Sequence, residues 1–157
     1  MNLIFRSATV LLPLPLLLTL CAPAALAFSN GDDLPDAQAL AQLELRAEQA
    51  GPRDQCFLYT ELVHTMTEIA GKQMLNGDVD QANATLKKVN HYAQLIHIDL
   101  AANSKRIKNA EMLMHSTTYR LTEYLHKASY EDQDALKGTL KQLNKVHEEL
   151  LAEVLKH

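Results

Sequence analysis

Apolar residues between positions 79 and 128 recur at alternating spacings of three and four. One row of them repeats every seven residues and consists of Leu86, Ala93, Leu100, Ile107, Met114, Leu121 and Ala128. A second row interleaves with it and consists of Ala82, Val89, Ile96, Ala110 and Tyr124. The stretch contains neither Pro nor Gly. This pattern predicts helices that pack against other helices.

The same stretch is too long to be one ordinary helix. A continuous helix over it would measure roughly 75 Å at 1.5 Å per residue, far more than the width of a small domain. Asn103 interrupts the apolar stripe, and Ser104 follows it. We therefore expect one helix from Val79 to about Asn103 and another from Ile107 to Ala128.

Weaker stripes predict two earlier helices. Pro35 suits the first turn of a helix that runs to about Ala50, and Asp36 suits its positive end. Gly51-Pro52 ends it, and a second helix follows from about Arg53 to Leu75.

The junction after the second helix carries a turn signal. Asn76-Gly77 is typical of a helix C-cap. Asp78 then suits an N-cap, with Gln81 placed as in a capping box. So tight a connection predicts that the helices on either side pack antiparallel.

A last helix follows a cap at Ser129. Its apolar stripe consists of Leu136, Leu140, Leu143, Leu150 and Val154. Gly138 lies within it and costs about 1 kcal/mol relative to Ala. The fold class is therefore all-α, with about five amphipathic helices in an antiparallel bundle or a short stack of helical hairpins.

One segment carries residues of a known hairpin family. Ile69-Ala70 precedes the turn at Gly77-Asp78, and apolar positions follow it at Ala82, Leu86 and Val89. Residues 66–94 thereby resemble a tetratricopeptide-type hairpin, although Gln94 stands where that family usually has Pro. The resemblance implies such a hairpin and, by analogy, a peptide-binding groove. The whole chain also resembles small exported all-helical proteins of bacteria that have no assigned function.

The N-terminus has the pattern of a secretory signal peptide over residues 1–27. Arg6 precedes an apolar run from Val10 to Leu20, and Ala25-Leu26-Ala27 is a small-x-small cleavage site. Residues 28–35 form a polar lead that we expect to be flexible, followed by one domain over residues 36–157. A membrane anchor is the alternative, but the run is short and interrupted by prolines. Lipidation at Cys21 is a second alternative.

The balance of charged residues bears on which partners the protein can bind. The chain has 15 basic and 19 acidic residues, and loss of Arg6 with the signal makes the remainder slightly more acidic. This balance argues against nucleic acid or anionic lipid as a partner. No later stretch is apolar enough to span a membrane.

Cys56 is the only cysteine after the signal, so no internal disulfide is possible. We expect a buried free thiol, with a nucleophile or an intermolecular disulfide as alternatives.

Two Glu-x-x-His motifs are the sharpest chemical signal. They are Glu61 with His64, and Glu123 with His126. In ferritin-like di-metal bundles this spacing places both ligands on one inward helix face. Here both motifs lie away from the apolar stripes, so we expect solvated polar pairs rather than a metal site.

The chain has seven histidines. We expect His91, His115 and His126 to be exposed, and His157 is the terminus. His147 lies on the last stripe and His97 flanks an earlier one, which predicts two partly buried, hydrogen-bonded imidazoles. A metal-binding or pH-sensitive pair is the alternative.

A short basic cluster consists of Lys105, Arg106 and Lys108. At the start of a helix the dipole disfavours these cations, which suggests an acidic partner; a solvated turn is the alternative. Acidic residues dominate positions 28–80 and bases lead afterwards, which is compatible with intramolecular pairing or head-to-tail self-association.

No hydrolase triad and no glycine-rich phosphate loop occur in the sequence, and no Cys-x-x-Cys-His motif for haem attachment. We therefore predict no enzyme and no cofactor. The leading hypothesis is a periplasmic or secreted helical module that binds a protein, a peptide or itself. A metal- or haem-binding bundle is the main alternative, and a chaperone-like protein with an exposed apolar groove is another.

Overall fold

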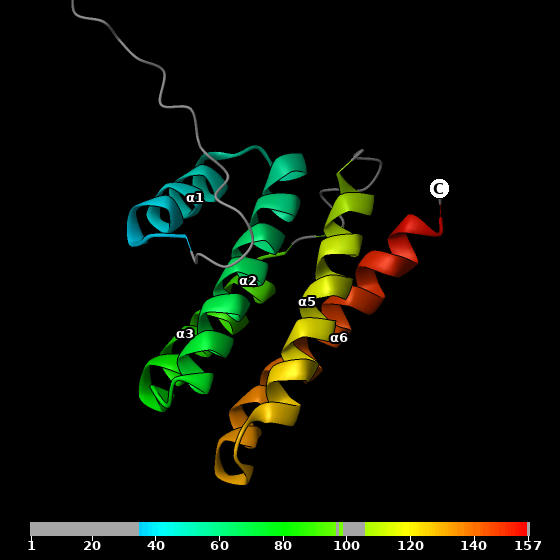
Figure 1. The fold of residues 1–157 in the computed structure, drawn as a ribbon. Helices are drawn as coiled ribbons and strands as arrows, with labels where there is room; N and C mark the ends of the chain where they lie inside the picture. The colour runs from blue at the N-terminus through cyan, green and yellow to red at the C-terminus, as the bar shows by residue number, and fades with distance from the viewer. Residues whose placement is uncertain (1–34, 97, 99–105, 157) are drawn as a thin grey trace, which may run out of the picture. The chain divides into compact units, whose positions relative to one another are not determined.

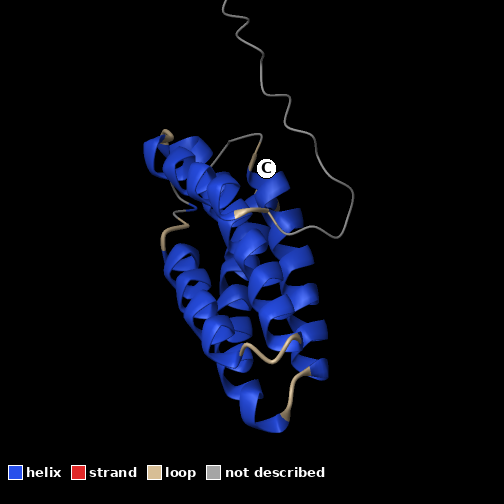
Figure 2. Cartoon of the chain, turned by 60° about the vertical axis from the view of Figure 1, so that its left-hand side comes forward, coloured by secondary structure: helices blue, strands red, loops and turns tan. Residues whose placement is uncertain are grey.

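Five α-helices and one short 3-10 helix form the regular structure of the computed structural model, which describes residues 35–96, 98 and 106–156 (Figures 1 and 2). The elements are α1 (Ala37–Gln49), α2 (Pro52–Leu75), α3 (Val79–Gln94), α5 (Ile107–Lys127), η1 (Tyr130–Asp132) and α6 (Gln133–Val154). All regular structure in these ranges is helical, which confirms the all-α prediction.

Several predictions concern residues outside the described ranges. They are the signal peptide with its cleavage site, most of the lead before Pro35, and the interpretations of Asn103, Lys105, His97 and His157. Among the described helices, none is both long enough and apolar enough to cross a bilayer.

The starts of α1 and α2 follow from their local sequence. Asp36 caps α1, because its carboxylate accepts a 2.6 Å hydrogen bond from the Ala39 backbone N–H. Pro35 therefore precedes the helix rather than lying in its first turn. Gly51 is the N-cap of α2 and Pro52 its first residue, so the pair that ends one helix also begins the next.

The turn between α2 and α3 is a Schellman motif, as Asn76-Gly77 predicts. Gly77 has φ 84°, and the Asp78 N–H donates to the Gln73 carbonyl at 2.9 Å. The predicted capping box with Gln81 is wrong, because the Asp78 side chain makes no cap hydrogen bond. Asp78 is held by the Schellman turn at ψ 58°, away from the extended conformation that an N-cap needs.

Among the described residues, the long apolar stretch contains two separate helices, α3 and α5, so the expected break is present. The first, α3, ends at Gln94, nine residues before Asn103, and α5 begins at Ile107. No Gly or Pro marks this end. Instead, Ile96 and Ile98 enter the core just beyond it, with exposures of 8% and 9%. Tertiary packing therefore sets the boundary rather than a local stop signal.

The prediction for the start of the last helix is partly wrong. Ser129 precedes the 3-10 turn η1, and its side chain makes no cap hydrogen bond to the backbone. Its hydroxyl donates instead to the Asp132 carboxylate at 2.5 Å. Helix α6 then begins at Gln133.

The helices form two hairpins that lie side by side (Figure 1). Hairpin α2–α3 packs on hairpin α5–α6 so that α2 lies beside α5 and α3 beside α6. Contacts advance in the same direction along neighbouring helices: His64 and then Glu68 of α2 bond Thr117 and then Arg120 of α5. Helices α2 and α5 are therefore parallel, and the fold is a short stack of hairpins. Helix α1 packs outside the stack, on α2.

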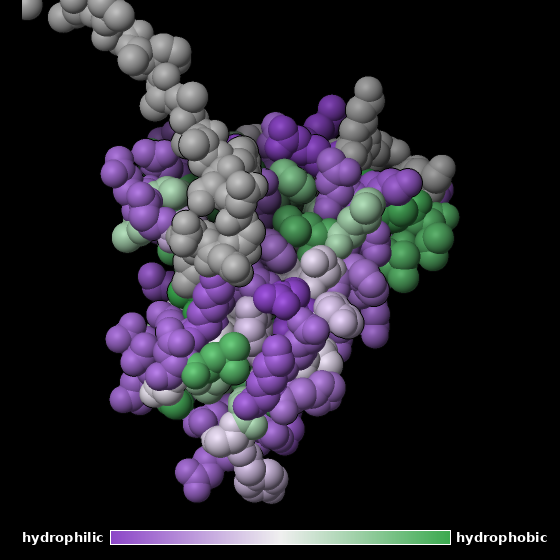
Figure 3. All heavy atoms as spheres, in the orientation of Figure 1, coloured by the Kyte–Doolittle hydropathy of each residue, from purple (hydrophilic) through white to green (hydrophobic). Residues whose placement is uncertain are grey.

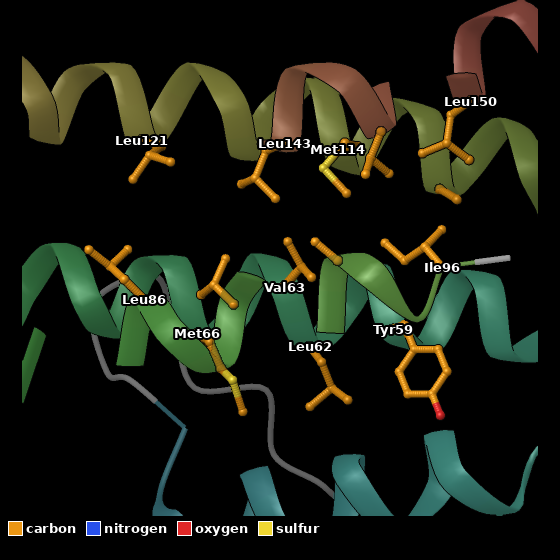
Figure 4. Packing of buried hydrophobic residues seen from close by; sticks show 14 of the residues in the cluster. Tyr59, Leu62, Val63, Met66, Leu86, Ile96, Met114, Leu121, Leu143 and Leu150 are labelled. Carbon is orange, nitrogen blue, oxygen red and sulfur yellow. The ribbon is translucent and has the colours of Figure 1, made fainter. Parts of the chain in front are cut away.

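The core lies between the two hairpins (Figure 4). Val63 of α2, Leu86 of α3 and Ile96, which follows α3, point toward the other hairpin. That hairpin contributes Met114, Leu121, Leu143 and Leu150. On α2, Tyr59, Leu62 and Met66 point the opposite way. Helix α2 therefore buries side chains on two sides.

Candidate functional site

The two Glu-x-x-His motifs do not converge on one site. His64 on α2 contacts Thr117 of α5, with 2.9 Å between Nδ1 and Oγ1. Glu123 lies six residues further along α5, about 9 Å at 1.5 Å per residue. Within the described ranges, no group of three or more His, Cys, Asp and Glu side chains is arranged to hold a metal ion.

His64 does not face water as expected; it is half-buried between α2 and α5. The Thr117 hydroxyl donates to the Leu113 carbonyl at 2.7 Å, so its oxygen accepts from a protonated His64 Nδ1. Burial lowers the pKa of His64 from its usual 6.5, with Glu68 opposing the shift and Arg120 adding to it. The expectation is wrong because α2 buries a second face, toward α5, that its apolar stripe does not mark.

The other members of the motifs are also placed unevenly. Glu61 and Glu123 are half-buried, whereas His126 is exposed as expected. Burial raises the pKa of Glu61, and the charges of Arg46 and Arg106 act in the opposite direction. Only His126 is therefore the solvated side chain that the sequence predicts.

A polar network around Arg120 joins α2 to α5. Its guanidinium donates to both carboxylate oxygens of Glu68, at 2.8 and 3.0 Å, and to Glu123 at 2.7 Å. The Tyr124 hydroxyl donates to Glu68 at 2.7 Å. Burial opposes ionisation of Glu68, but the hydrogen bonds from Arg120 and Tyr124 hold its pKa below the usual value. Each of these groups has a protein partner, which is the arrangement of a structural clamp.

The clamp is pressed closely onto α2. Gly71 lies under the ring of Tyr124, and a Cβ atom at this position would overlap the ring. Tyr124 is 3% exposed and its hydroxyl is fixed by Glu68 and Arg120. The approach of α5 to α2 therefore requires glycine at position 71.

The other histidines of the described residues, His91, His115 and His147, agree with their expected exposure. His91 and His115 are exposed, and His147 is half-buried with Nε2 3.1 Å from Glu111 Oε1. The rings of His115 and His147 lie 5.2 Å apart between centroids. His147 is thus a partly buried, hydrogen-bonded imidazole, as the sequence predicts.

Cys56 is a free thiol buried near the start of α2, as expected, with 2% exposure. Burial raises its pKa to about 11. At neutral pH the side chain is therefore a protonated thiol rather than the thiolate that a nucleophile requires.

The basic cluster is partly used within the fold. The Arg106 guanidinium lies 3.2 Å from the Asp54 carboxylate and 5.2 Å from the centroid of the Phe57 ring. Lys108 is exposed. The contacts of Arg106 with Asp54 and of Arg120 with Glu68 each join a basic residue from the second half of the chain to an acidic residue from the first half. Intramolecular pairing therefore accounts for part of the uneven charge.

The seam between α3 and α6 is more open than the clamped seam between α2 and α5. A hollow of about 410 Å³ lies along it. It is lined by Asn83, Leu86, Lys87, Asn90, Asp134, Ala135, Gly138 and Thr139. A second hollow of about 340 Å³ continues along the same two helices, lined by residues that include Ile96, Lys145 and Glu149. We call the two hollows together the α3–α6 groove.

Two polar atoms of the groove have no hydrogen-bond partner among the described residues. The side-chain oxygens of Asn83 and Asn90 are buried and find no hydrogen-bond donor among the described residues. The Asn90 amide nitrogen does donate to Thr139 at 3.0 Å, and Gln142 donates to the Asn90 carbonyl at 2.8 Å. An unsatisfied buried acceptor costs about 1–3 kcal/mol. Such an atom is expected to accept a hydrogen bond from a water molecule or from a ligand.

Gly138 lies in the same hollow and has no structural requirement to be glycine. A Cβ atom there would meet nothing within 4 Å, and the residue lies inside helix α6. Glycine here costs about 1 kcal/mol relative to alanine. Its effect is to widen the groove and to let another backbone approach α6 closely.

Sequence reasoning missed Asn83 and Asn90 as site residues. Their spacing of seven places them on one face of α3 beside buried Leu86, and this was the available signal. Gly138 was noticed, but only as a cost to the helix. What the sequence does not contain is the pairing of α3 with α6, which brings the three residues to one hollow.

The opposite surface offers less to a ligand. The face seen in Figure 3, over α2 and α5, is largely hydrophilic. Hydrophobic atoms gather at the C-terminal end of α6, where Leu151 and Leu155 are exposed.

Comparison with known protein families, curated proteins and solved structures gives no match for this chain. The candidate site therefore rests on the groove itself.

Proposed function

We propose that this protein is an exported, non-enzymatic helical module that binds a polypeptide segment in the α3–α6 groove. The observation that carries the proposal is the pair of donorless side-chain oxygens on Asn83 and Asn90, opposite Gly138. A polypeptide main chain supplies N–H donors at regular intervals. The glycine leaves room for that chain against α6.

Energetics favour a ligand over a purely structural role for the groove. Two buried acceptors have no donor among the described residues, and a glycine stands inside a helix where alanine would be favoured by about 1 kcal/mol. A bound main chain offsets the cost of the acceptors. The resemblance of residues 66–94 to a tetratricopeptide-type hairpin also supports a peptide ligand, and the signal pattern of residues 1–27 supports export.

The metal- or haem-binding alternative has less support. His64 and His147 are the half-buried histidines of the described residues, and each ring already bonds a protein group, Thr117 and Glu111 respectively. Cys56 is buried and protonated at neutral pH.

Binding can be tested on an array of short immobilised peptides of systematically varied composition. We expect the purified protein to bind a subset of them, and Gly138→Leu to reduce that binding about tenfold or more by filling the groove. Ala152→Leu is the matched control, because it adds the same side chain at an exposed position of α6 outside the groove. Thermal melts would verify that both variants fold. The proposal fails if the protein binds no peptide, or if Gly138→Leu binds as well as the control.

A further inference from the structure

The spacing of the two acceptors in the α3–α6 groove restricts the shape of a bound chain. Asn83 and Asn90 are seven residues apart, which places them on one face of α3 and about 10.5 Å apart along its axis. The Asn90 amide nitrogen donates to Thr139, which identifies the other terminal atom of that side chain as the acceptor. A ligand that serves both oxygens must therefore present two donors at about this separation.

Of the regular backbone conformations, polyproline II comes closest to this separation. In polyproline II every third residue returns to the same side of the chain, after an advance of about 9.3 Å. In a β-strand the N–H groups on one edge recur at every second residue, which gives about 6.7 Å or about 13.4 Å. In an α-helix the N–H groups beyond the first turn are already bonded within the helix. Polyproline II therefore fits the two oxygens better than a strand or a helix.

The charges along the groove are balanced. Lys87 and Asp134 line the first hollow, and Lys145 and Glu149 line the second. The Lys145 ammonium lies 3.8 Å from the Glu149 carboxylate. Charge therefore does not select the partner, and the hydrogen-bonding pattern of its main chain becomes the deciding property.

The length of the groove sets the length of the segment. Along α6 the lining extends from Asp134 in the first hollow to Glu149 in the second, a rise of about 22 Å. A polyproline II chain covers that distance in about seven residues. Gly138 lies between these positions, and the space over its Cα is open, which leaves room for a proline ring.

We propose that the α3–α6 groove binds a proline-rich segment of about seven residues in the polyproline II conformation. Two residues of the segment, three positions apart, donate their main-chain N–H groups to Asn83 and Asn90. Proline fits at the two positions between them but not at the donor positions, because it has no N–H. This inference rests on the proposed function and adds the conformation and composition of the partner.

The test is fluorescence anisotropy with three labelled, uncharged peptides of seven residues. The donor peptide has alanine at the first, fourth and seventh positions and proline elsewhere. The shifted peptide has the same composition, with alanine at the first, third and fifth positions, so that no two of its N–H groups are three residues apart. The third peptide is all proline, which keeps the conformation and removes the donors.

We expect the donor peptide to bind about tenfold tighter than either of the others. Its affinity should change little as salt rises, because the peptide is uncharged. Equal binding of the donor and all-proline peptides would show that the N–H groups are not used and would overturn the inference. Equal binding of the donor and shifted peptides would overturn the spacing on which it depends.

A variant locates the acceptor. Asn83→Leu removes one of the two oxygens, so the advantage of the donor peptide over the all-proline peptide should shrink several-fold. Asn109→Leu is the matched control, because it makes the same change at an exposed position of α5 outside the groove, and it should keep the full advantage. An undiminished advantage in Asn83→Leu would contradict the assigned hydrogen bond.

The outcomes separate the two proposals. If peptides from the array bind and Gly138→Leu weakens them, but the donor peptide does not bind, then the polyproline II segment is wrong and the groove function stands. If no peptide of either set binds, both proposals fail.

Discussion

Substitution of Gly71 by alanine tests the packing of α2 against α5 most sharply. The added Cβ would overlap the ring of Tyr124. That ring cannot move aside easily, because it is 3% exposed and its hydroxyl donates to Glu68 at 2.7 Å and accepts from Arg120 at 3.0 Å. The helices must therefore separate, or the ring must leave its pocket and lose these bonds.

The expected change in the free energy of unfolding is the sum of opposing contributions. Overpacking of a core costs about 1–3 kcal/mol, and loss of a hydrogen bond to a charged group costs about 1.5–3 kcal/mol. Alanine in place of glycine returns about 1 kcal/mol through helix propensity. We expect Gly71→Ala to lower the free energy of unfolding by about 2 kcal/mol. Gly138→Ala makes the same chemical change in open space, and we expect it to raise that free energy by about 1 kcal/mol.

Urea unfolding followed by circular dichroism measures both variants against the parent protein. The two midpoints should move in opposite directions. A Tyr124→Leu background adds a further check, because the cost of Gly71→Ala should shrink once the ring is gone. If Gly71→Ala raises the midpoint as Gly138→Ala does, the close packing of α5 on α2 described above is incorrect.

Further predictions concern individual side chains. The folded-state pKa of His64 is below its unfolded value of 6.5, so its contribution to stability is complete above about pH 6.5 and is lost as pH falls through the folded pKa. His64→Gln should therefore flatten the acid decline of the urea midpoint, and an unchanged slope would contradict this. Arg120→Met keeps the aliphatic stem but removes the clamp; since Arg120 is 39% exposed, we expect a loss of only about 1–2 kcal/mol in urea unfolding, and no loss would argue against the clamp. Cys56 should react slowly with a thiol reagent until urea unfolds the chain, because its pKa is raised to about 11; fast reaction of the folded protein would show that the thiol is accessible. Asn83→Leu should raise the urea midpoint, since it removes an unsatisfied acceptor, yet weaken peptide binding; a lowered midpoint would mean that the side-chain oxygen already has a partner.

Helices and turns were largely predictable from local sequence because their signals are local. The heptad spacing of apolar residues marked α3, α5 and α6, and Asn76-Gly77 marked the Schellman turn. The capping box at Asp78 failed because the same turn fixes the backbone of that residue. The end of α3 was misplaced because burial of Ile96 and Ile98, rather than a stop signal, sets it.

The second buried face of α2 was not predictable, because its residues do not look like a core. Thr60 and Thr67 are fully buried there through hydroxyl bonds to their own helix, at 2.8 Å to Cys56 and 2.7 Å to Val63. His64 was therefore assigned to solvent. Its burial depends on α5 lying parallel to α2, which is a tertiary property.

The α3–α6 groove could not be predicted from local sequence either. Gly138 was visible as a costly residue, but its openness depends on what packs against α6. In the sequence, Asn83 and Asn90 look like ordinary polar positions. Only the structure shows that no described residue donates a hydrogen bond to their side-chain oxygens.

The central claim is that a polypeptide main chain docks between α3 and α6. Titration of the ¹⁵N-labelled protein with a peptide that it binds on the array, followed by amide chemical shifts, tests it most directly. The account predicts that the largest shifts fall on backbone and side-chain amides from Asn83 to Asn90 and from Gly138 to Gln142. Shifts concentrated around Arg120 and Tyr124, with the amides of the groove unmoved, would contradict it.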